Sequence, residues 1–266
     1  MKSNVFDVQG KVKGQVDLPK VFSTPVRPDL IKRAVQSVQS HNRQPNGTDP
    51  LAGKRTSAHY HSVRHYRYSM MNKEMARMQR IHEGPGGLQW TARFVPQSRK
   101  GRVSHPPKPN QDFSQKMNNK ERVLAIKSAI AATAFNDIVS KRGHIISNMV
   151  LPIIVEDSVQ EIKKSKQLKE LLEKLGMVEE LERSSKKKIR AGRGKMRGRK
   201  YKRRVGPLIV IGEDKGISMA TKNIEGMECC LVKNLNAEML APGTYAGRLT
   251  IFTESSIKKL GEIYGK

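Results

Sequence analysis

Periodic hydrophobic positions at the start of the chain predict a β-hairpin followed by a helix. The apolar residues of VFDV and QVDLP are separated by the turn-like QGKVKG, a pattern typical of two antiparallel strands. Pro28 then precedes DLIKRAVQSVQSH, whose apolar residues recur along one face at helical spacing. Because proline is favoured in the first turn of a helix, this stretch is predicted to be helical.

The second half of the chain alternates short apolar runs with amphipathic stretches. LPIIVED and PLIVIGED resemble each other and are rich in β-branched residues, which is typical of buried parallel strands. MECCLVK and RLTIFT predict two further strands. Helices are predicted from Asn118 or Asn119 to near Gly143, over KSKQLKELLEKLGM and over SSIKKLGEIYG. This alternation indicates an α/β fold with a mostly parallel sheet and flanking helices.

The hydrophobic pattern is lost in two places. Residues 43–108 hold Gly, Pro, Arg, His, Tyr and Met without a sustained period, apart from one possible short helix over NKEMARMQRIH. Residues 184–206 are dominated by Lys, Arg and Gly. A loop as long as the first segment implies an outside partner. We therefore expect a discontinuous globular domain, 1–42 with 109–266, that carries an extended loop at 43–108 and a basic insertion at 184–206.

The positive charge is concentrated in the same two segments. Residues 43–108 carry thirteen Lys or Arg against three acids, and residues 184–204 carry twelve against none, which together account for 22 of the 27 net positive charges. Charge at this density repels itself unless a polyanion neutralises it, and the usual intracellular polyanion is nucleic acid. A membrane partner is not expected, because neither segment forms a basic amphipathic helix with a broad apolar face.

The candidate chemistry is sparse. Cys229 and Cys230 are the only cysteines, and as strand neighbours they point to opposite faces, so we expect no disulfide. This fits a reducing compartment, and we expect a soluble protein of the cytoplasm. HYHSVRH at 59–65 does not favour a metal, because the cysteines lie far away and its arginines repel cations. No paired carboxylates, nucleophile with its base or Walker loop is found. We expect no enzyme, cofactor or small-molecule substrate.

Two further patterns have both a functional and a structural interpretation. The glycines of AGRGKMRGR precede a strand rather than follow one, which argues against a dinucleotide-binding fingerprint. They favour a backbone that approaches RNA phosphates closely. A solvated localisation signal is the alternative. Four acids end the two similar strands and could line a cleft, but surface acids that balance local charge are the simpler interpretation. They are Glu156, Asp157, Glu213 and Asp214.

RNA binding is the function that these residues predict. Aromatic rings between the arginines of the long loop could stack on unpaired bases, or instead form a small aromatic core; they are Tyr60, His61, Tyr66, Tyr68 and Trp90. Cations of both segments could contact phosphates. They are Lys54, Arg55, Arg64, Arg67, Arg77, Arg80, Arg93, Arg99, Lys100, Arg102, Lys186, Lys187, Lys188, Arg190, Arg193, Lys195, Arg197, Arg199, Lys200, Lys202 and Arg203.

Several phrases resemble one protein family over nearly the whole chain. RPDLIKRAVQS, DPLAGKRTSA, HPPKP, NNKERVLAIKSAIAATA, RGH, IRAGRGKMRGRKYK and NLNAEMLAPGTYAGRLTIFTESSIKKL are similar to the fourth protein of the large ribosomal subunit in its archaeal and eukaryotic form, and the length is that of the archaeal form. The tip departs from the family, since HYHSVRHYRYSMMNKEM replaces a glycine-rich stretch common in relatives.

The resemblance implies an α/β domain on the outer face of the subunit and a loop that penetrates ribosomal RNA. The loop tip would line the constriction of the exit tunnel, with Tyr60, His61, Tyr66, Tyr68 and Trp90 as tunnel-lining candidates, and 186–204 would be a second RNA-binding insertion. The implied partners are large-subunit ribosomal RNA, neighbouring ribosomal proteins and the nascent polypeptide. Two alternatives stay open: a regulator that binds its own messenger, and an RNA-processing enzyme with a pocket in the α/β body.

Overall fold

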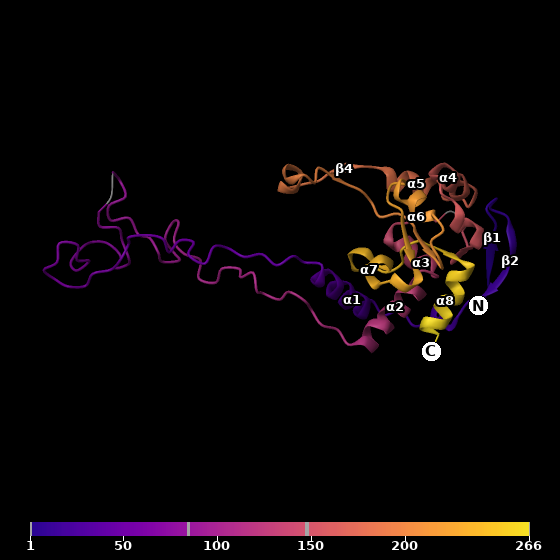
Figure 1. Ribbon diagram of the computed structural model, residues 1–266, viewed down its shortest axis with the longest axis horizontal. Coiled ribbons are helices and arrows are strands. Elements are labelled where there is room, and N and C mark those ends of the chain that lie inside the picture. Colours follow the sequence, from indigo (N-terminus) through magenta and orange to yellow (C-terminus); the bar gives the residue numbers. More distant parts are fainter. Residues whose placement is uncertain (1, 84–85, 147–148, 266) are drawn as a thin grey trace. The chain divides into compact units, whose positions relative to one another are not determined.

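The computed structural model describes residues 2–83, 86–146 and 149–265 (Figure 1). The chain divides into two compact units. The first, called the body here, comprises the described residues up to Asn42 and from Ser114 onward, and the second runs from Arg43 to Phe113.

A six-stranded sheet forms the centre of the body. Its strands are β1 (Lys2–Phe6), β2 (Val12–Asp17), β3 (Ile153–Val155), β6 (Leu208–Ile211), β7 (Glu228–Leu231) and β8 (Thr250–Thr253). The order is β2-β1-β3-β8-β6-β7, and every neighbouring pair is parallel except the β1–β2 hairpin. The predicted hairpin, the four later strands and the mostly parallel α/β fold are confirmed. The strand order could not be predicted.

Side chains alternate between two hydrophobic cores on the two faces of this sheet. Ile154, between Ile153 and Val155 on β3, joins one core, while its two neighbours join the other. On β7 the same alternation places Cys230 in the first core and Cys229 against the second, and both thiols are free, as predicted. Central strands buried on both faces explain why the sequence shows continuous apolar runs there.

Helices cover both faces. The first core includes residues of α1 (Pro28–His41), α2 (Asn119–Ala132), α7 (Ala237–Leu240) and α8 (Glu254–Tyr264), with the 3-10 turns η1 (Lys20–Ser23) and η4 (Val232–Asn234). The second includes residues of α3 (Asn136–Arg142), α4 (Ser165–Lys174), α6 (Ile217–Lys222) and η2 (Asp157–Glu161), with Leu181 of α5 (Val178–Ser185) packed against it. A short 3-10 segment, η5 (Pro242–Thr244), follows α7.

The helix predicted from about residue 118 to Gly143 is two helices, α2 and α3, that meet at 94°. The break follows Thr133, whose hydroxyl donates to the Ile130 carbonyl at 2.7 Å, and Phe135 is extended. The bend allows α2 to pack in the first core while Val139 of α3 packs in the second. The end at Gly143, which adopts the left-handed conformation, is as predicted.

The short helix predicted over 72–82 is wrong. No helix forms in its described residues, because Arg80 instead pairs in extended form with His59 and with Ala92, and Asn72 has a positive φ of 55°. The helices α5, α6 and α7 were not predicted; they span 8, 6 and 4 residues, too few to give a clear period. Within the described residues no single helix has the length and hydrophobicity to cross a bilayer; the bent pair α2 and α3 meets the criterion only jointly.

Candidate nucleic-acid interface

The basic insertion is a small hairpin between α5 and β6, near the label β4 in Figure 1. Strand β4 (Lys188–Ile189) pairs antiparallel with β5 (Tyr201–Lys202), and the 3-10 turn η3 (Arg193–Arg197) joins them. Gly192 and Gly198 flank this turn with φ of 75° and 77°, a conformation that costs glycine least. We call residues 188–202 the basic hairpin.

The cations of the basic hairpin face solvent. Lys186, Lys187, Lys188, Arg193, Lys195, Arg197, Arg199, Lys200, Lys202 and Arg203 are all exposed. Arg190 is half-buried because its Nε donates to the Arg199 carbonyl at 3.1 Å across the hairpin. In the described part of the chain, no side chain from Lys188 to Lys202 pairs with a carboxylate. The hairpin is therefore a positive surface that its own protein leaves unneutralised.

A buried ionic group in the body holds the chain at Val205, three residues after the hairpin. Glu180 of α5 is fully buried and accepts from Arg183 at 2.6 and 2.7 Å, and from Nδ1 of His144 at 2.7 Å. The same Arg183 donates to the Val205 carbonyl at 2.8 Å. Burial raises the pKa of Glu180, but the hydrogen bonds from Arg183 and His144 outweigh it and lower the pKa overall. Burial lowers the pKa of His144.

A second buried guanidinium holds the next residue. Arg248, only 1 % exposed, donates from Nε to the Gly206 carbonyl at 2.9 Å and from Nη1 to Glu228 at 2.6 Å. Nearer the hairpin, Lys187 and Arg203 both lie beside Glu225, at 3.5 and 3.1 Å. We call residues 186–187 and 203–206, which flank the hairpin, its stem. Arg183, Arg248 and Glu225 hold this stem by hydrogen bonds or ion pairs.

The second unit is held by a few backbone contacts between distant parts of residues 43–113. His59 and Arg80 exchange hydrogen bonds of 3.2 and 3.1 Å, and the Trp90 amide donates to the Ile81 carbonyl at 2.7 Å. Gly53 and Gly101 allow close backbone approach, since a Cβ on Gly53 would lie 2.5 Å from the Gly101 carbonyl oxygen. These two glycines therefore have a packing role inside the unit, which the sequence did not indicate.

The predicted phosphate-binding residues of this unit differ in their surroundings. Lys54, Arg64, Arg67, Arg77, Arg99 and Lys100 are exposed, and Arg102 is half-buried. Arg55 is exposed but paired with Asp49, and this hydrogen bond lowers the pKa of that carboxyl. Arg80 donates to the carbonyls of Trp90 and Ala76, at 2.8 and 3.0 Å, and Arg93 donates to that of Arg99 at 2.6 Å. Arg80 and Arg93 thus also hold the unit's own backbone.

The aromatic residues form a cluster around His82. Its ring lies 4.8 Å from that of Tyr68, 5.9 Å from that of Trp90 and 4.9 Å from that of His61, measured between centroids. Tyr60 and Tyr66 are exposed. Burial and the nearby positive charges lower the pKa of His82. Nothing in the sequence pointed to His82, which lies far along the chain from the HYHSVRH motif.

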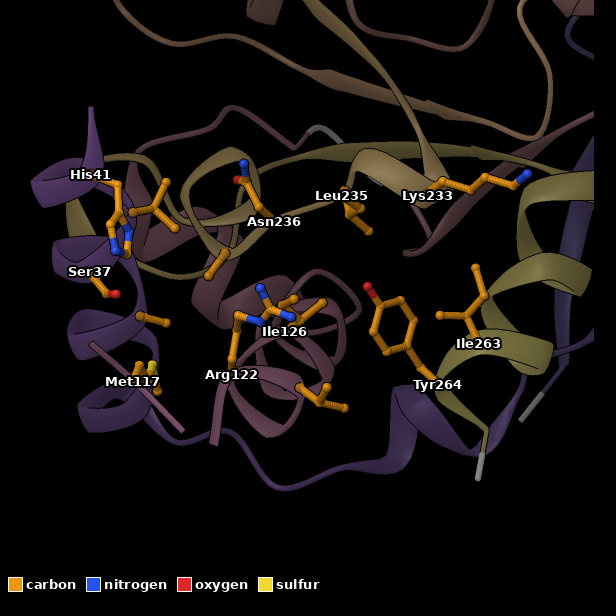
Figure 2. A pocket seen from close by; sticks show the side chains of 14 residues that line it. Ser37, His41, Met117, Arg122, Ile126, Lys233, Leu235, Asn236, Ile263 and Tyr264 are labelled. Atoms are coloured by element: carbon orange, nitrogen blue, oxygen red, sulfur yellow. The ribbon is translucent and has the colours of Figure 1, made fainter. Parts of the chain in front are cut away.

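A cavity of about 420 Å³ lies in the body between α1, α2, α8 and the stretch from Lys233 to Ala237 (Figure 2). Figure 2 shows His41, Arg122, Lys233 and Tyr264 around an apolar floor that includes Ile126. Its lining contains no carboxylate.

The acids at the ends of β3 and β6 have structural partners. Glu156 pairs with Lys13 at 2.5 Å, and Glu213 with Lys259 at 3.0 Å. Asp157 accepts from the amide and hydroxyl of Ser255, and Asp214 accepts from the Gly216 amide in the turn before α6. These contacts agree with the interpretation of the four residues as structural.

Comparison with known proteins gives matches along almost the entire chain. The model of the family described as "Ribosomal protein L4/L1 family" matches residues 16–263. A protein named "Large ribosomal subunit protein uL4" from Methanosphaera stadtmanae is 44% identical, over 100% of this chain and 98% of the relative. Proteins of the same name from Methanocaldococcus jannaschii and Archaeoglobus fulgidus are 45% and 41% identical, each over 98% of this chain and 99% of the relative.

Proposed function

The chain belongs to the ribosomal protein L4/L1 family, and we propose that it is a structural, non-enzymatic component of the large ribosomal subunit in the cytoplasm. The full-length match to relatives named as large-subunit proteins supports this proposal. Its partners are large-subunit ribosomal RNA and the neighbouring ribosomal proteins.

The basic hairpin binds ribosomal RNA through the phosphate backbone. The observation that carries this proposal is the set of exposed cations between Lys188 and Lys202, for which the described residues supply no carboxylate partner. The chain next to them is anchored by Arg183 and Arg248. Cations on a hairpin can reach phosphates of several RNA strands, and such contacts fix position rather than read sequence. The anchored stem reduces the entropy lost when the hairpin binds.

Residues 43–108 form the loop that enters the RNA core and reaches the polypeptide exit tunnel. The exposed cations of this loop contact phosphates along its length, and the exposed rings of Tyr60 and Tyr66 are available to unpaired bases or to the nascent chain. His61, Tyr68 and Trp90 support the tip from inside the aromatic cluster. Domain 1–42 with 109–266 stays outside the RNA and carries both segments.

The experiment compares two variants that each lose four charges. Arg193, Lys195, Arg197 and Arg199 are replaced by alanine in the test variant, and Arg190 is kept because it bonds across the hairpin. The control replaces Lys164, Lys166, Lys169 and Lys258, exposed residues of α4 and α8 or next to α4. Binding to a large-subunit RNA fragment is measured across salt concentrations. The slope of log K against log salt should fall by up to ~0.7–0.9 per lost contact in the test variant only.

Equal slopes for the wild type and the test variant would remove the hairpin from the RNA interface. Sedimentation of a lysate through a high-salt gradient tests the larger proposal separately. The chain should stay with the large subunit at salt that removes loosely bound factors. A chain that instead sediments free, or with one short RNA, would support the messenger-binding regulator.

A further inference from the structure

Three histidines converge in the second unit, although one of them is distant from the other two in the sequence. His59 and His61 come from one extended stretch and His82 from another. Ring centroids lie 4.3 Å apart for His59 and His61, 4.3 Å for His59 and His82, and 4.9 Å for His61 and His82. One ring nitrogen from each can be chosen so that all three lie within 4.8 Å of one another.

The backbone fixes this convergence. The mutual hydrogen bonds of His59 and Arg80 set the register of the two stretches, so that His82 follows the paired position by two residues. On the other side, the Met70 amide donates to the His61 carbonyl at 3.1 Å, and Met70 is fully buried. The histidines are therefore brought together by main-chain contacts rather than by chance meetings of mobile side chains.

The hydrogen-bond contacts of the three rings leave nitrogens that a metal could bind. Nδ1 of His59 lies 2.8 Å from the Ser57 carbonyl, so this nitrogen carries the proton and leaves Nε2 as a lone-pair donor. His82 is 5 % exposed, and among the residues that the structure describes neither of its ring nitrogens finds a hydrogen-bond partner; Nε2 of His61 is likewise buried without one. Buried polar atoms without partners cost free energy, and a bound cation would satisfy them.

We propose that His59, His61 and His82 form a binding site for a divalent transition-metal ion of the zinc class. Three imidazoles are a donor set that suits Zn²⁺ and its neighbours rather than the oxygen-seeking Mg²⁺ or Ca²⁺. With Zn–N bonds of ~2.0–2.1 Å, nitrogens around a tetrahedral ion lie roughly 3.3 Å apart, so small ring rotations close the present separations. Water takes the fourth position.

The ion would act as a clip within a unit that is held by few backbone contacts. It would join residues 59–61 to residue 82 and close the intervening loop, and its binding free energy would stabilise the folded unit. The cations Arg64, Arg67 and Lys73 oppose binding by charge repulsion, and Lys73 already lies over the Trp90 ring at 3.4 Å. RNA phosphates near the same segment would offset that repulsion.

The test uses the full-length protein without a polyhistidine tag, freed of RNA and treated with a chelator. Zn²⁺ is titrated in competition with a chromophoric chelator, and Co²⁺ is added separately because its visible spectrum reports a tetrahedral site. The expected result is one tight equivalent. His59→Gln and His82→Gln should each weaken binding by at least the ~10–100-fold typical of losing a supporting outer-shell group.

Matched controls come from the same unit. His65→Gln and His105→Gln change exposed histidines outside the trio and should leave the affinity unaltered. His59 is itself exposed, so its replacement opens no cavity and separates a lost ligand from a misfolded unit. Zn²⁺ should also slow trypsin cleavage at Arg64, Arg67 and Arg77 in the wild type but not in His59→Gln. Equal affinity of the wild type and His59→Gln, or no stoichiometric binding by the wild type, would overturn the proposal.

Discussion

Replacing Glu180 with alanine should be one of the most damaging single substitutions in the body. The carboxylate is fully buried and, within the described ranges, is the one acid bonded to Arg183, whose side chain is 10 % exposed. Removing one member of a buried ion pair leaves the other charge without compensation, which typically costs about 3–5 kcal/mol. His144 loses its Nδ1 acceptor in the same change. We therefore expect the free energy of unfolding to fall by about 3–5 kcal/mol.

The assay is urea denaturation of the full chain followed by far-ultraviolet circular dichroism. This signal reports the helices of the body, whereas the single tryptophan, Trp90, lies in the other unit and would report that unit instead. Glu182→Ala on the exposed side of α5 is the matched control and should change the free energy by less than ~0.5 kcal/mol. A loss below about 1 kcal/mol for Glu180→Ala would refute the reasoning.

Three other predictions follow from the same structure. Stability of the body should decline as the pH falls below about 6.5, because His144 has a lowered pKa and stays neutral while an unfolded histidine binds a proton. It should decline again below about 4.3, because the folded pKa of Glu180 is also lowered and protonation removes its stabilising charge. Denaturation at several pH values, followed by circular dichroism, tests this, and His144→Gln should reduce the upper step. Gly101→Ala should speed hydrogen exchange of the Arg102 amide, which donates to the Phe94 carbonyl, because the new Cβ would lie 2.0 Å from the Val95 carbonyl oxygen and displace this backbone. An unchanged exchange rate would contradict that packing. Burial raises the pKa of Cys229 to about 12 and of Cys230 to about 11, so alkylation at pH 8 should be slow in the folded protein and fast in urea, with mass spectrometry as the measurement.

The sequence pattern predicted best those strands in which every residue is buried. The strands β3, β6 and β8 are buried on both faces, so their apolar runs were unambiguous. The break between α2 and α3 was hidden, because the two helices pack on opposite faces of the sheet and the apolar residues around Thr133 satisfy either side. A sequence records how apolar a position is, but not which core receives it.

The residues of the candidate site also fall into two groups, those that the sequence identified and those that it did not. The cations of the basic hairpin could be identified from charge density alone, because they are exposed and their position does not depend on contacts with distant parts of the chain. The groups that hold the hairpin could not, since Arg183 meets Glu180 on one helix turn but reaches Val205 across the stem, and Arg248 reaches Gly206 from a distant part of the chain. His82 was missed for the same reason, because its approach to His59 depends on pairing between separate stretches.

Because two buried arginines anchor the hairpin, some arginines of this region should tolerate replacement by lysine and others should not. Arg183 binds a carboxylate through two nitrogens and a carbonyl through one of them, and Arg248 similarly reaches Gly206 and Glu228 with different nitrogens. A lysine has one nitrogen and cannot span such partners at once. On the exposed hairpin, either lysine or arginine could supply the charge that the proposed phosphate contacts need. Replacement of arginine by lysine should therefore be tolerated at the exposed positions 193, 197 and 199 and should destabilise the protein at positions 183 and 248.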